Sequence, residues 1–263
     1  MKRRAVPILL YLAASLATSS ATSEDLRPGI IGNDDRITVE NGGWPWDAIG
    51  QVNIGGYRNS SKCTGTLVAP DLVLTAAHCV MDRLNNAPYP LHTIHFLAGA
   101  RRAENKGHAT AKCLRFLSGY EFIRPKRAGL TRGTMQAPLG ALLKDAALIV
   151  LNDKLAVAPA ALGDNAAVRQ ESSLVHAGYP ADRRFVLSAH DNCRLVRSPA
   201  GAPLWFTDCD THPASSGGPI FMRAEGRLKL VAIMVATARH QANVALPISE
   251  WAELLRTEGC PPP

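Results

Sequence analysis

Residues 63–80 read CTGTLVAPDLVLTAAHCV and carry the strongest structural signal in the chain. Two runs rich in Val, Leu and Thr, at 63–68 and 72–75, flank a Pro-Asp pair, which indicates two β-strands joined by a turn. His78 follows the second strand closely, and cysteines stand near both ends of the stretch. The stretch therefore predicts a strand hairpin that leads into a loop carrying a candidate functional histidine.

Short strands continue on both sides of this stretch. Further candidate strands lie at 48–54, 95–98, 110–117, 146–151, 173–177, 185–188, 193–196, 204–207, 219–223, 228–236 and 244–248. Gly, Pro, Asn and Asp separate them, and Glu225-Gly226 is typical of a hairpin turn. Only 249–259 indicates a helix, with Ser249 as its cap and Gly259 at its end. Regularly spaced short strands favour an all-β barrel or sandwich.

Composition excludes several protein classes. The 263 residues are 46% hydrophobic and 19% charged, which argues against global disorder. The 21 Gly and 18 Pro follow no period, so the chain is not collagen-like. No glycine-rich phosphate loop is present, and the net charge of +7 is too modest to indicate nucleic-acid binding. We expect Trp44, Trp46 and Trp205 to be core anchors.

The first residues indicate export. Three basic residues at 2–4 precede an apolar run at 5–17 and then small residues, which is the pattern of a signal peptide ending at residue 21. The run is shorter than the roughly 20 residues of a membrane span, although an uncleaved anchor is the alternative. Residues 22–29 form a possible short pro-segment. We expect a secreted or periplasmic protein whose six cysteines form disulfides and not a metal site.

Three segments place His, Asp and Ser in that order along the chain. They are 74–79 (LTAAHC), 145–151 (DAALIVL) and 214–219 (ASSGGP). A serine hydroxyl is a poor nucleophile unless a base lies within hydrogen-bond reach, and the base needs an acceptor that sets its tautomer. Each segment alone is a weak signal. Their occurrence together in an exported, strand-rich chain points to nucleophilic catalysis.

These segments resemble the motifs of the chymotrypsin-like (trypsin-fold) serine peptidases. IIGNDDR, PWDAIGQV, HAGYP, CDTHPASSGGPIF and NVALPISEW are similar to landmarks of the bacterial glutamyl-endopeptidase-like branch. The resemblance spans about residues 30–255. It implies two six-stranded antiparallel barrels, at about 30–155 and 156–248, and a C-terminal helix at 249–259, within a peptidase domain at 30–260.

The resemblance also implies the roles of individual residues. Ser216 would attack the scissile carbonyl, His78 would take its proton, and Asp145 would orient His78. The backbone N–H groups of Ala214 and Ser216 would form the oxyanion hole. Two departures stand out. Ala214 replaces a common glycine, and a Cβ costs roughly 1–2 kcal/mol if the position needs a positive φ. Ser215 replaces the Asp that binds a new amino terminus in trypsin-type enzymes, so no such switch is expected.

The cysteines suggest three disulfides. Cys63–Cys79 matches the family's disulfide at the histidine loop. Cys193 and Cys209 lie on consecutive expected strands that lead to the serine, which makes a pair. Cys113–Cys260 remains by elimination.

Three residues bear on substrate specificity through the same resemblance. Asp210 lies six residues before Ser216, at the base of the primary specificity pocket, where a carboxylate favours Arg or Lys. Thr211 supplies the small hydroxyl residue of the glutamyl branch, but Met234 stands where that branch has a histidine. We therefore expect basic or uncharged residues before the scissile bond in preference to Glu. The alternative is that Asp210 is structural and bonded to backbone.

The predicted function is an exported serine endopeptidase, acting on polypeptide substrates through an acyl-enzyme, with no cofactor or metal. His92 and His95 would point to opposite faces of a strand and do not indicate a metal site. We expect a monomer with no nucleic-acid partner and no stable membrane insertion once the signal is removed. The alternatives are an inactive binding protein on the same scaffold, which would recruit a partner through the basic segment 122–144, or an esterase using the same triad.

Overall fold

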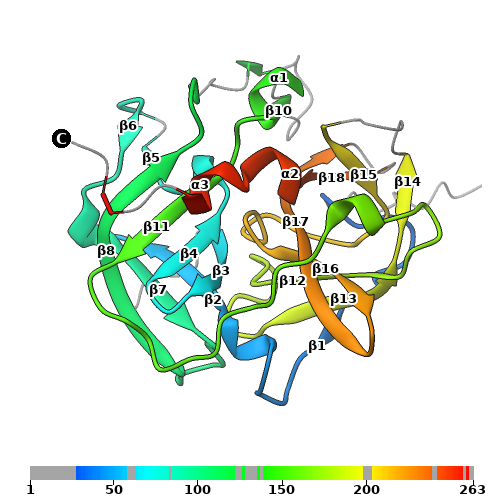
Figure 1. The fold of residues 1–263 in the computed structure, drawn as a ribbon, viewed down its shortest axis with the longest axis horizontal. Coiled ribbons are helices and arrows are strands. Elements are labelled where there is room, and N and C mark those ends of the chain that lie inside the picture. The colour runs from blue at the N-terminus through cyan, green and yellow to red at the C-terminus, as the bar shows by residue number, and fades with distance from the viewer. Residues whose placement is uncertain are drawn as a thin grey trace, which may run out of the picture.

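The computed structural model describes residues 28–57, 63–82, 84–121, 126–127, 135–136, 139–197, 203–238, 242–256 and 259–260. The expected signal peptide and much of the basic segment 122–144 lie outside these residues. Figure 1 shows two β-structures side by side, the first built from the earlier half of the chain and the second mainly from the later half. The expected all-β class is confirmed.

The first β-structure is a closed six-stranded antiparallel barrel, as expected. Its strands follow one another in the order β11-β4-β3-β2-β7-β8. They are β2 (Ile49–Ile54), β3 (Cys63–Ala69), β4 (Leu72–Thr75), β7 (Ile94–Ala98), β8 (Gly107–Phe116) and β11 (Ala147–Leu151). The barrel forms because alternate apolar side chains, such as Leu67, Phe96 and Ile149, are fully buried inside it.

The second β-structure, expected as a six-stranded barrel, is an eight-stranded half-barrel sheet in the order β1-β13-β12-β16-β17-β18-β15-β14. Its strands are β1 (Ile37–Thr38), β12 (Leu174–Gly178), β13 (Ser188–Cys193), β14 (Leu195–Arg197), β15 (Trp205–Thr207), β16 (Pro219–Ala224), β17 (Arg227–Ala238) and β18 (Ala242–Pro247). Only Arg194 separates β13 from β14, yet β13 pairs with β12 and β14 pairs with β15 at the other end of the sheet. The sheet therefore curls round on itself, closed by the covalent chain and not by a complete ring of strand pairing.

Of two local predictions, the turn at Glu225-Gly226 is confirmed and the strand at 185–188 is wrong. Glu225 and Gly226 have φ of 53° and 72° and form the turn between β16 and β17, as the sequence indicates. The strand expected at 185–188 is wrong, because this segment is a series of turns with Phe185 57% exposed, and β13 begins only at Ser188. An aromatic residue in a loop looks like part of a strand when only sequence is available.

The C-terminal helix is shorter than expected. It consists of α2 (Ile248–Trp251) and α3 (Glu253–Arg256). The residue before the first turn is Pro247, so Ser249 does not cap the helix; its hydroxyl donates to the Glu250 carboxylate instead. The buried Trp251 anchors the helix, and its Nε1 donates to the Leu246 carbonyl at 3.3 Å.

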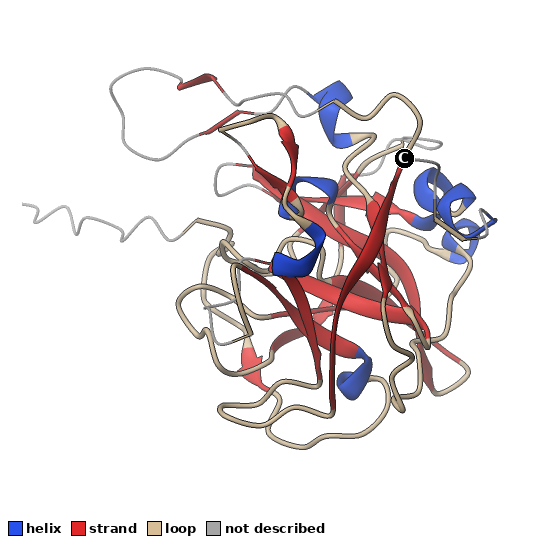
Figure 2. Ribbon diagram, turned by 90° about the vertical axis from the view of Figure 1, so that its left-hand side faces the viewer, coloured by secondary structure: helices blue, strands red, loops and turns tan. Residues whose placement is uncertain are grey.

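The remaining elements are short. They are β5 (Met81–Asp82), β6 (Ala87–Pro88), β9 (Lys126–Arg127), β10 (Met135–Gln136), α1 (Leu139–Leu142) and 3-10 turns at Trp46–Ala48, Ala77–Cys79, Leu91–Thr93 and Asn165–Ala167. Figure 2 shows the helical segments as brief turns around a body of strands and loops. Within the described residues, no helix is long and apolar enough to cross a membrane.

The two β-structures are packed against each other. Buried side chains of both belong to one continuous apolar core, which includes Leu74 and Leu148 of the first and Val175 and Phe221 of the second. Tyr179, which follows β12, is fully buried and donates its hydroxyl to the Ala100 carbonyl of the first half at 2.9 Å. This junction brings the histidine loop and the serine loop together.

Candidate active site

His78 and Asp145 lie in direct contact at the end of the first barrel. His78 sits in the 3-10 turn after β4, and Asp145 lies two residues before the start of β11, which pairs with β4. The His78 ring Nδ1 is 2.7 Å from Asp145 Oδ2, and the His78 backbone N–H donates to Oδ1 at 2.9 Å. Asp145 is 5% exposed. One carboxylate therefore fixes both the backbone and the ring of His78.

This contact determines which ring nitrogen of His78 can act as a base. An ionised carboxylate can only accept hydrogen bonds, so Nδ1 carries the proton that it donates to Asp145. The neutral ring then has its lone pair at Nε2. That is the tautomer required to accept a proton from a serine hydroxyl.

Ser216 reaches this position through the backbone of β3. The Thr64 N–H donates to the Ser216 carbonyl at 2.9 Å, and the Thr64 hydroxyl donates to the Ala214 carbonyl at 3.1 Å. The neighbouring Cys63 is bonded to Cys79, next to His78. The serine loop is thus attached to the strand that leads to the histidine loop. Ser216 Oγ and His78 Nε2 are not hydrogen-bonded to each other, and both residues are described; such contacts are often long in free enzymes.

Gly217 shows how closely the two loops approach. Its φ is 80°, and a Cβ there would collide with Thr64 O and Thr75 Oγ1 and lie 2.7 Å from the Ala76 N. Only glycine fits beside the strand that precedes His78. The glycine after the candidate nucleophile is therefore required by the junction of the two halves.

The backbone around Ser216 presents two free donors. The Pro213 carbonyl accepts from the Ala181 N–H at 2.7 Å, and the Ser215 carbonyl accepts from the Gly218 N–H at 2.9 Å. Trans peptides hold N–H and C=O on opposite sides, so the N–H groups of Ala214 and Ser216 point away from these partners. Neither N–H has an acceptor among the described residues. The arrangement can therefore accept an oxyanion.

Ala214 has φ of 79°, which L residues with a Cβ rarely adopt. We expect Ala214→Gly to stabilise the protein by up to about 1 kcal/mol, because glycine removes the strain at a small entropic cost in the unfolded chain. The measurement is the free energy of unfolding in denaturant. Ala166→Gly, at an exposed 3-10 position without positive φ, should lower it by roughly 0.5–1 kcal/mol. Equal destabilisation by both changes would contradict the strain.

The three disulfides join the pairs expected from the sequence. They are Cys63–Cys79, Cys113–Cys260 and Cys193–Cys209. The first links β3 to the histidine loop, and the third links β13 to the segment before Ser216. The second ties the C-terminal end to β8, where Arg115 Nε also donates to the Gly259 carbonyl at 2.8 Å.

Asp210 does not lie free at the base of a pocket. It is 1% exposed, and its Oδ1 and Oδ2 accept the backbone N–H groups of Ile31 and Asp35, both at 2.8 Å. Its own N–H donates to His190 Nδ1 at 2.8 Å. Burial raises the pKa of Asp210, and the two backbone N–H groups oppose that rise. The carboxylate holds the segment that begins near residue 30.

Thr211 and Met234 are both buried beside the serine loop. The Met234 carbonyl accepts from the Gly217 N–H at 2.7 Å. Thr211 Oγ1 is 3.1 Å from Nε2 of His176, and the other ring nitrogen of His176 is 3.1 Å from the Pro219 carbonyl. Because that carbonyl only accepts, His176 is protonated at Nδ1 and its Nε2 accepts the Thr211 hydroxyl proton. Burial lowers the pKa of His176 to about 4, so the ring stays neutral near pH 7.

Several of these residues escaped the sequence analysis. Thr64, His176 and Ala181 belong to strands and turns whose partners are far along the chain, so no local pattern marked them. The motif HAGYP, at 176–180, contributes to the family resemblance, but the sequence predicts no function for its individual residues.

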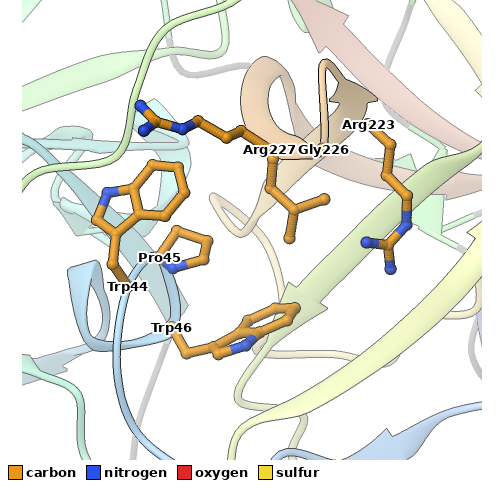
Figure 3. A pocket seen from close by; sticks show the side chains of 7 residues that line it. Trp44, Pro45, Trp46, Arg223, Gly226 and Arg227 are labelled. Atoms are coloured by element: carbon orange, nitrogen blue, oxygen red, sulfur yellow. The ribbon is translucent and has the colours of Figure 1, made fainter.

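A pocket of about 560 Å³ lies elsewhere, between the segment at 44–46 and the β16–β17 hairpin (Figure 3). Figure 3 shows Trp44 at the left with Arg227 above it, Trp46 at the bottom, and Arg223 at the right. None of the triad residues lines it. Trp44 is 40% exposed, unlike the core anchor that was expected, whereas Trp205 is buried as expected.

Three groups of side chains with metal-ligand spacing occur among the described residues, and each has other contacts. Two of the three groups in the described residues contain cysteines already joined in disulfides. The third, Asp35, His190 and Asp210, is occupied by the backbone contacts of Asp210.

Comparisons with known proteins agree with this fold. Two solved structures have similar folds. A Glu endopeptidase in complex with MPD superposes with a TM-score of 0.68 at 21% identity, covering 86% of this chain and 97% of that one. The VesB protease of Vibrio cholerae superposes with a TM-score of 0.64 at 16% identity, covering 87% and 67%. At these identities, the likeness establishes the fold alone.

Curated relatives match over shorter stretches. The vitellin-degrading protease of Bombyx mori is 40% identical over 77 residues, which are 28% of this chain and 25% of that protein. The modular serine protease of Drosophila melanogaster is 36% identical over 77 residues, 28% of this chain and 12% of that protein. The matched stretch thus spans a quarter or less of these relatives. A family model described as "Trypsin-like peptidase domain" matches residues 63–233, well over half of the chain, and on that match the chain belongs to the trypsin-like peptidase domain family.

Proposed function

We propose that this protein is an exported serine endopeptidase that cleaves polypeptides with Ser216, His78 and Asp145. The observation that carries the proposal is the contact of 2.7 Å between His78 Nδ1 and the buried Asp145, beside a serine loop held on β3 by Thr64. Family membership supports a peptidase, and the packing of the closed barrel against the curled sheet supports a site at their junction.

The proposed reaction follows from this geometry. Ser216 Oγ attacks the scissile carbonyl while His78 Nε2 takes its proton, and the Ala214 and Ser216 N–H groups stabilise the negative oxygen. The protonated His78 then gives its proton to the leaving amine, so that the peptide bond breaks and an acyl-enzyme remains. A water molecule then attacks that ester while His78 takes one of its protons. The ester bond to Ser216 breaks, the acid product leaves, and the protonated His78 returns the proton to the Ser216 oxygen.

A fluorophosphonate probe and paired substrates test this function. Covalent labelling of Ser216 together with cleavage of an unstructured polypeptide supports the proposal. Absence of labelling in a folded protein favours the inactive binding scaffold. Labelling with hydrolysis of ester substrates but not of the matched amides favours an esterase.

For the primary specificity pocket we propose an uncharged substrate residue. The Asp210 carboxylate is buried and used by backbone N–H groups, which supports a structural role and gives Arg or Lys little to bind. The Thr211 hydroxyl donates its only proton to His176, so it has none for a Glu carboxylate. Met234 supplies a thioether where the glutamyl branch has a histidine.

Reporter peptides that differ only in Leu, Arg, Lys or Glu before the scissile bond measure this preference. We expect the highest kcat/KM for Leu, and at least about tenfold lower values for the charged residues, because a charge buried without a partner is costly. A strong Arg preference that disappears in Asp210→Ser would contradict the proposal, as would efficient cleavage after Glu.

Export is supported by two independent features. Residues 1–21 have the composition of a signal peptide, and all six cysteines are paired in disulfides, which persist in oxidising compartments. We therefore propose that the protein acts outside the cytoplasm. N-terminal sequencing of the protein recovered outside cells tests this, because a chain that still begins at Met1 would contradict removal of the signal.

A further inference from the structure

The residue before the candidate nucleophile raises a structural question. Ser215 is buried, and its hydroxyl cannot form the ion pair with an amino terminus that orders this loop in trypsin-type enzymes. Ala214, one residue earlier, nevertheless has a strained backbone that surrounding contacts must maintain. Some other interaction has to hold the Pro213–Ala214 peptide in place.

We propose that Arg36 and Asp182 are positioning residues that hold the oxyanion-binding N–H of Ala214 through the Ala181 N–H. This inference rests on the proposed function, because it assigns a role in the same site. It accounts for activation without an inserted amino terminus.

The first step is a forked ion pair between the buried Arg36 and the partly exposed Asp182. Arg36 is 6% exposed, and its Nη1 and Nη2 donate to the two Asp182 carboxylate oxygens at 3.1 and 2.7 Å. Its Nε and Nη2 also donate to Asp34, both at 2.8 Å. A guanidinium that bonds two carboxylates in this way has little orientational freedom. Asp182 is therefore held against the segment that carries Arg36, 146 residues earlier in sequence.

The second step is a tight turn that contains Asp182. The Arg183 N–H donates to the Pro180 carbonyl at 2.9 Å, so residues 180–183 form a β-turn with Ala181 at its second position. Arg183 reaches back, donating to the Arg36 carbonyl at 2.9 Å and to Asp34 at 3.0 Å. The turn is thus fixed at two of its four residues.

The third step connects the turn to the oxyanion hole. The Ala181 N–H donates to the Pro213 carbonyl at 2.7 Å, and Thr64 holds the Ala214 carbonyl from the other side. With both flanking carbonyls bound, the two peptide planes around Ala214 cannot rotate freely. The Ala214 N–H is therefore kept on the side opposite to Ala181.

The charges around the network balance locally. Asp34 and Asp182 face Arg36 and Arg183, and His212 Nδ1 lies 3.5 Å from Asp182 Oδ1. The hydrogen bond from Arg36 lowers the pKa of Asp34 to about 2, and Arg36 likewise lowers the pKa of Asp182 against the opposing effect of burial. Asp210 anchors the same segment at Ile31 and Asp35. The segment at 31–36 is thus held beside the serine loop by these side-chain contacts.

Asp182→Asn tests the ion pair with little change in shape. We expect kcat to fall about tenfold with KM within about twofold, because the oxyanion donor acts on the transition state. A peptide boronic acid should bind weaker by a similar factor. The matched control is Asp47→Asn, which weakens another partly buried ion pair, with Arg101 at 3.0 Å, that does not contact the serine loop. This control should retain wild-type kcat.

A second pair of variants isolates the backbone donor. Ala181→Pro removes the N–H that holds Pro213 and puts the ring Cδ where the proton pointed, so this contact cannot form, at a turn position that favours proline. Ala181→Gly keeps the N–H. We expect kcat to fall at least tenfold in the first and to change less than threefold in the second.

The outcomes separate this inference from the proposed function. Wild type that neither cleaves peptides nor reacts with the fluorophosphonate probe overturns both. Active wild type, with kcat in Ala181→Pro unchanged, overturns the inference alone. So does a loss in Asp182→Asn that the Asp47→Asn control reproduces. If Asp182→Asn does not fold, the comparison of kcat between Ala181→Pro and Ala181→Gly still tests the inference.

Discussion

Replacing Ser216 with alanine is expected to lower kcat by about six orders of magnitude, because the hydroxyl is the only nucleophile the proposed mechanism uses. The fold should persist, since the Thr64 N–H binds the Ser216 carbonyl and not its side chain. Active-site titration with a fluorophosphonate, together with kcat on a peptide reporter, measures the effect.

Ser215→Ala is the matched control for this change. Ser215 is adjacent and buried, but it has no role in the proposed reaction, so this variant should be labelled and remain active. His78→Ala should lose about as much activity as Ser216→Ala, and the double variant should lose no more, because the two residues act as a unit. Near-normal turnover in Ser216→Ala would refute the mechanism.

Asp145→Asn is expected to lower kcat by about four orders of magnitude while leaving the site's shape intact. In the wild type, the His78 backbone N–H donates to Asp145 Oδ1, and the Asn oxygen of the variant can accept the same hydrogen bond. Its amide then faces Nδ1 as a donor, so His78 would carry its proton at Nε2 and could not act as the base. The measurement is kcat on the same reporter, with circular dichroism as the test of folding.

Asp82→Asn is a suitable control for the loss of one carboxylate. Asp82 ends β5, close to the histidine loop in sequence, and among the described residues its side chain accepts hydrogen bonds from Leu84 and Asn85 of its own turn. We expect this variant to retain wild-type kcat. A loss in Asp145→Asn smaller than about tenfold would show that the contact between His78 and Asp145 has no catalytic importance.

Local sequence patterns were sufficient for most strands of the two β-structures. Alternating Val, Leu and Thr between turn residues marks β3 and β4, and Glu225-Gly226 marks the β16–β17 hairpin, because these signals depend on neighbours in sequence. The pattern failed at 185–188 and at Ser249. At 185–188 the Phe185 and Leu187 carbonyls accept hydrogen bonds from the distant Arg102 and Val39. At Ser249 the helix has already begun after Pro247, so the serine does not stand at the cap.

The residues of the candidate site also fall into those that local motifs predict and those whose roles depend on distant contacts. His78, Asp145 and Ser216 could be predicted because each lies in a short motif of consecutive residues. Asp210 was open to two interpretations, and the contacts with Ile31 and Asp35, more than 170 residues away, favour the structural one. Such contacts leave no periodicity that could be read in advance.

By itself, the sequence determined the all-β class, the triad candidates and the number of cysteines available for pairing. Tertiary structure alone decided that Thr64 holds the serine loop, that His176 takes the Thr211 proton, and that Arg36 reaches Asp182. The physical reason is that strand formation and turn chemistry depend on nearby residues, whereas a hydrogen bond between distant residues depends on how the two β-structures meet. The orientation of the Ala214 N–H belongs to the second kind, since it is set by carbonyl partners on two separate segments.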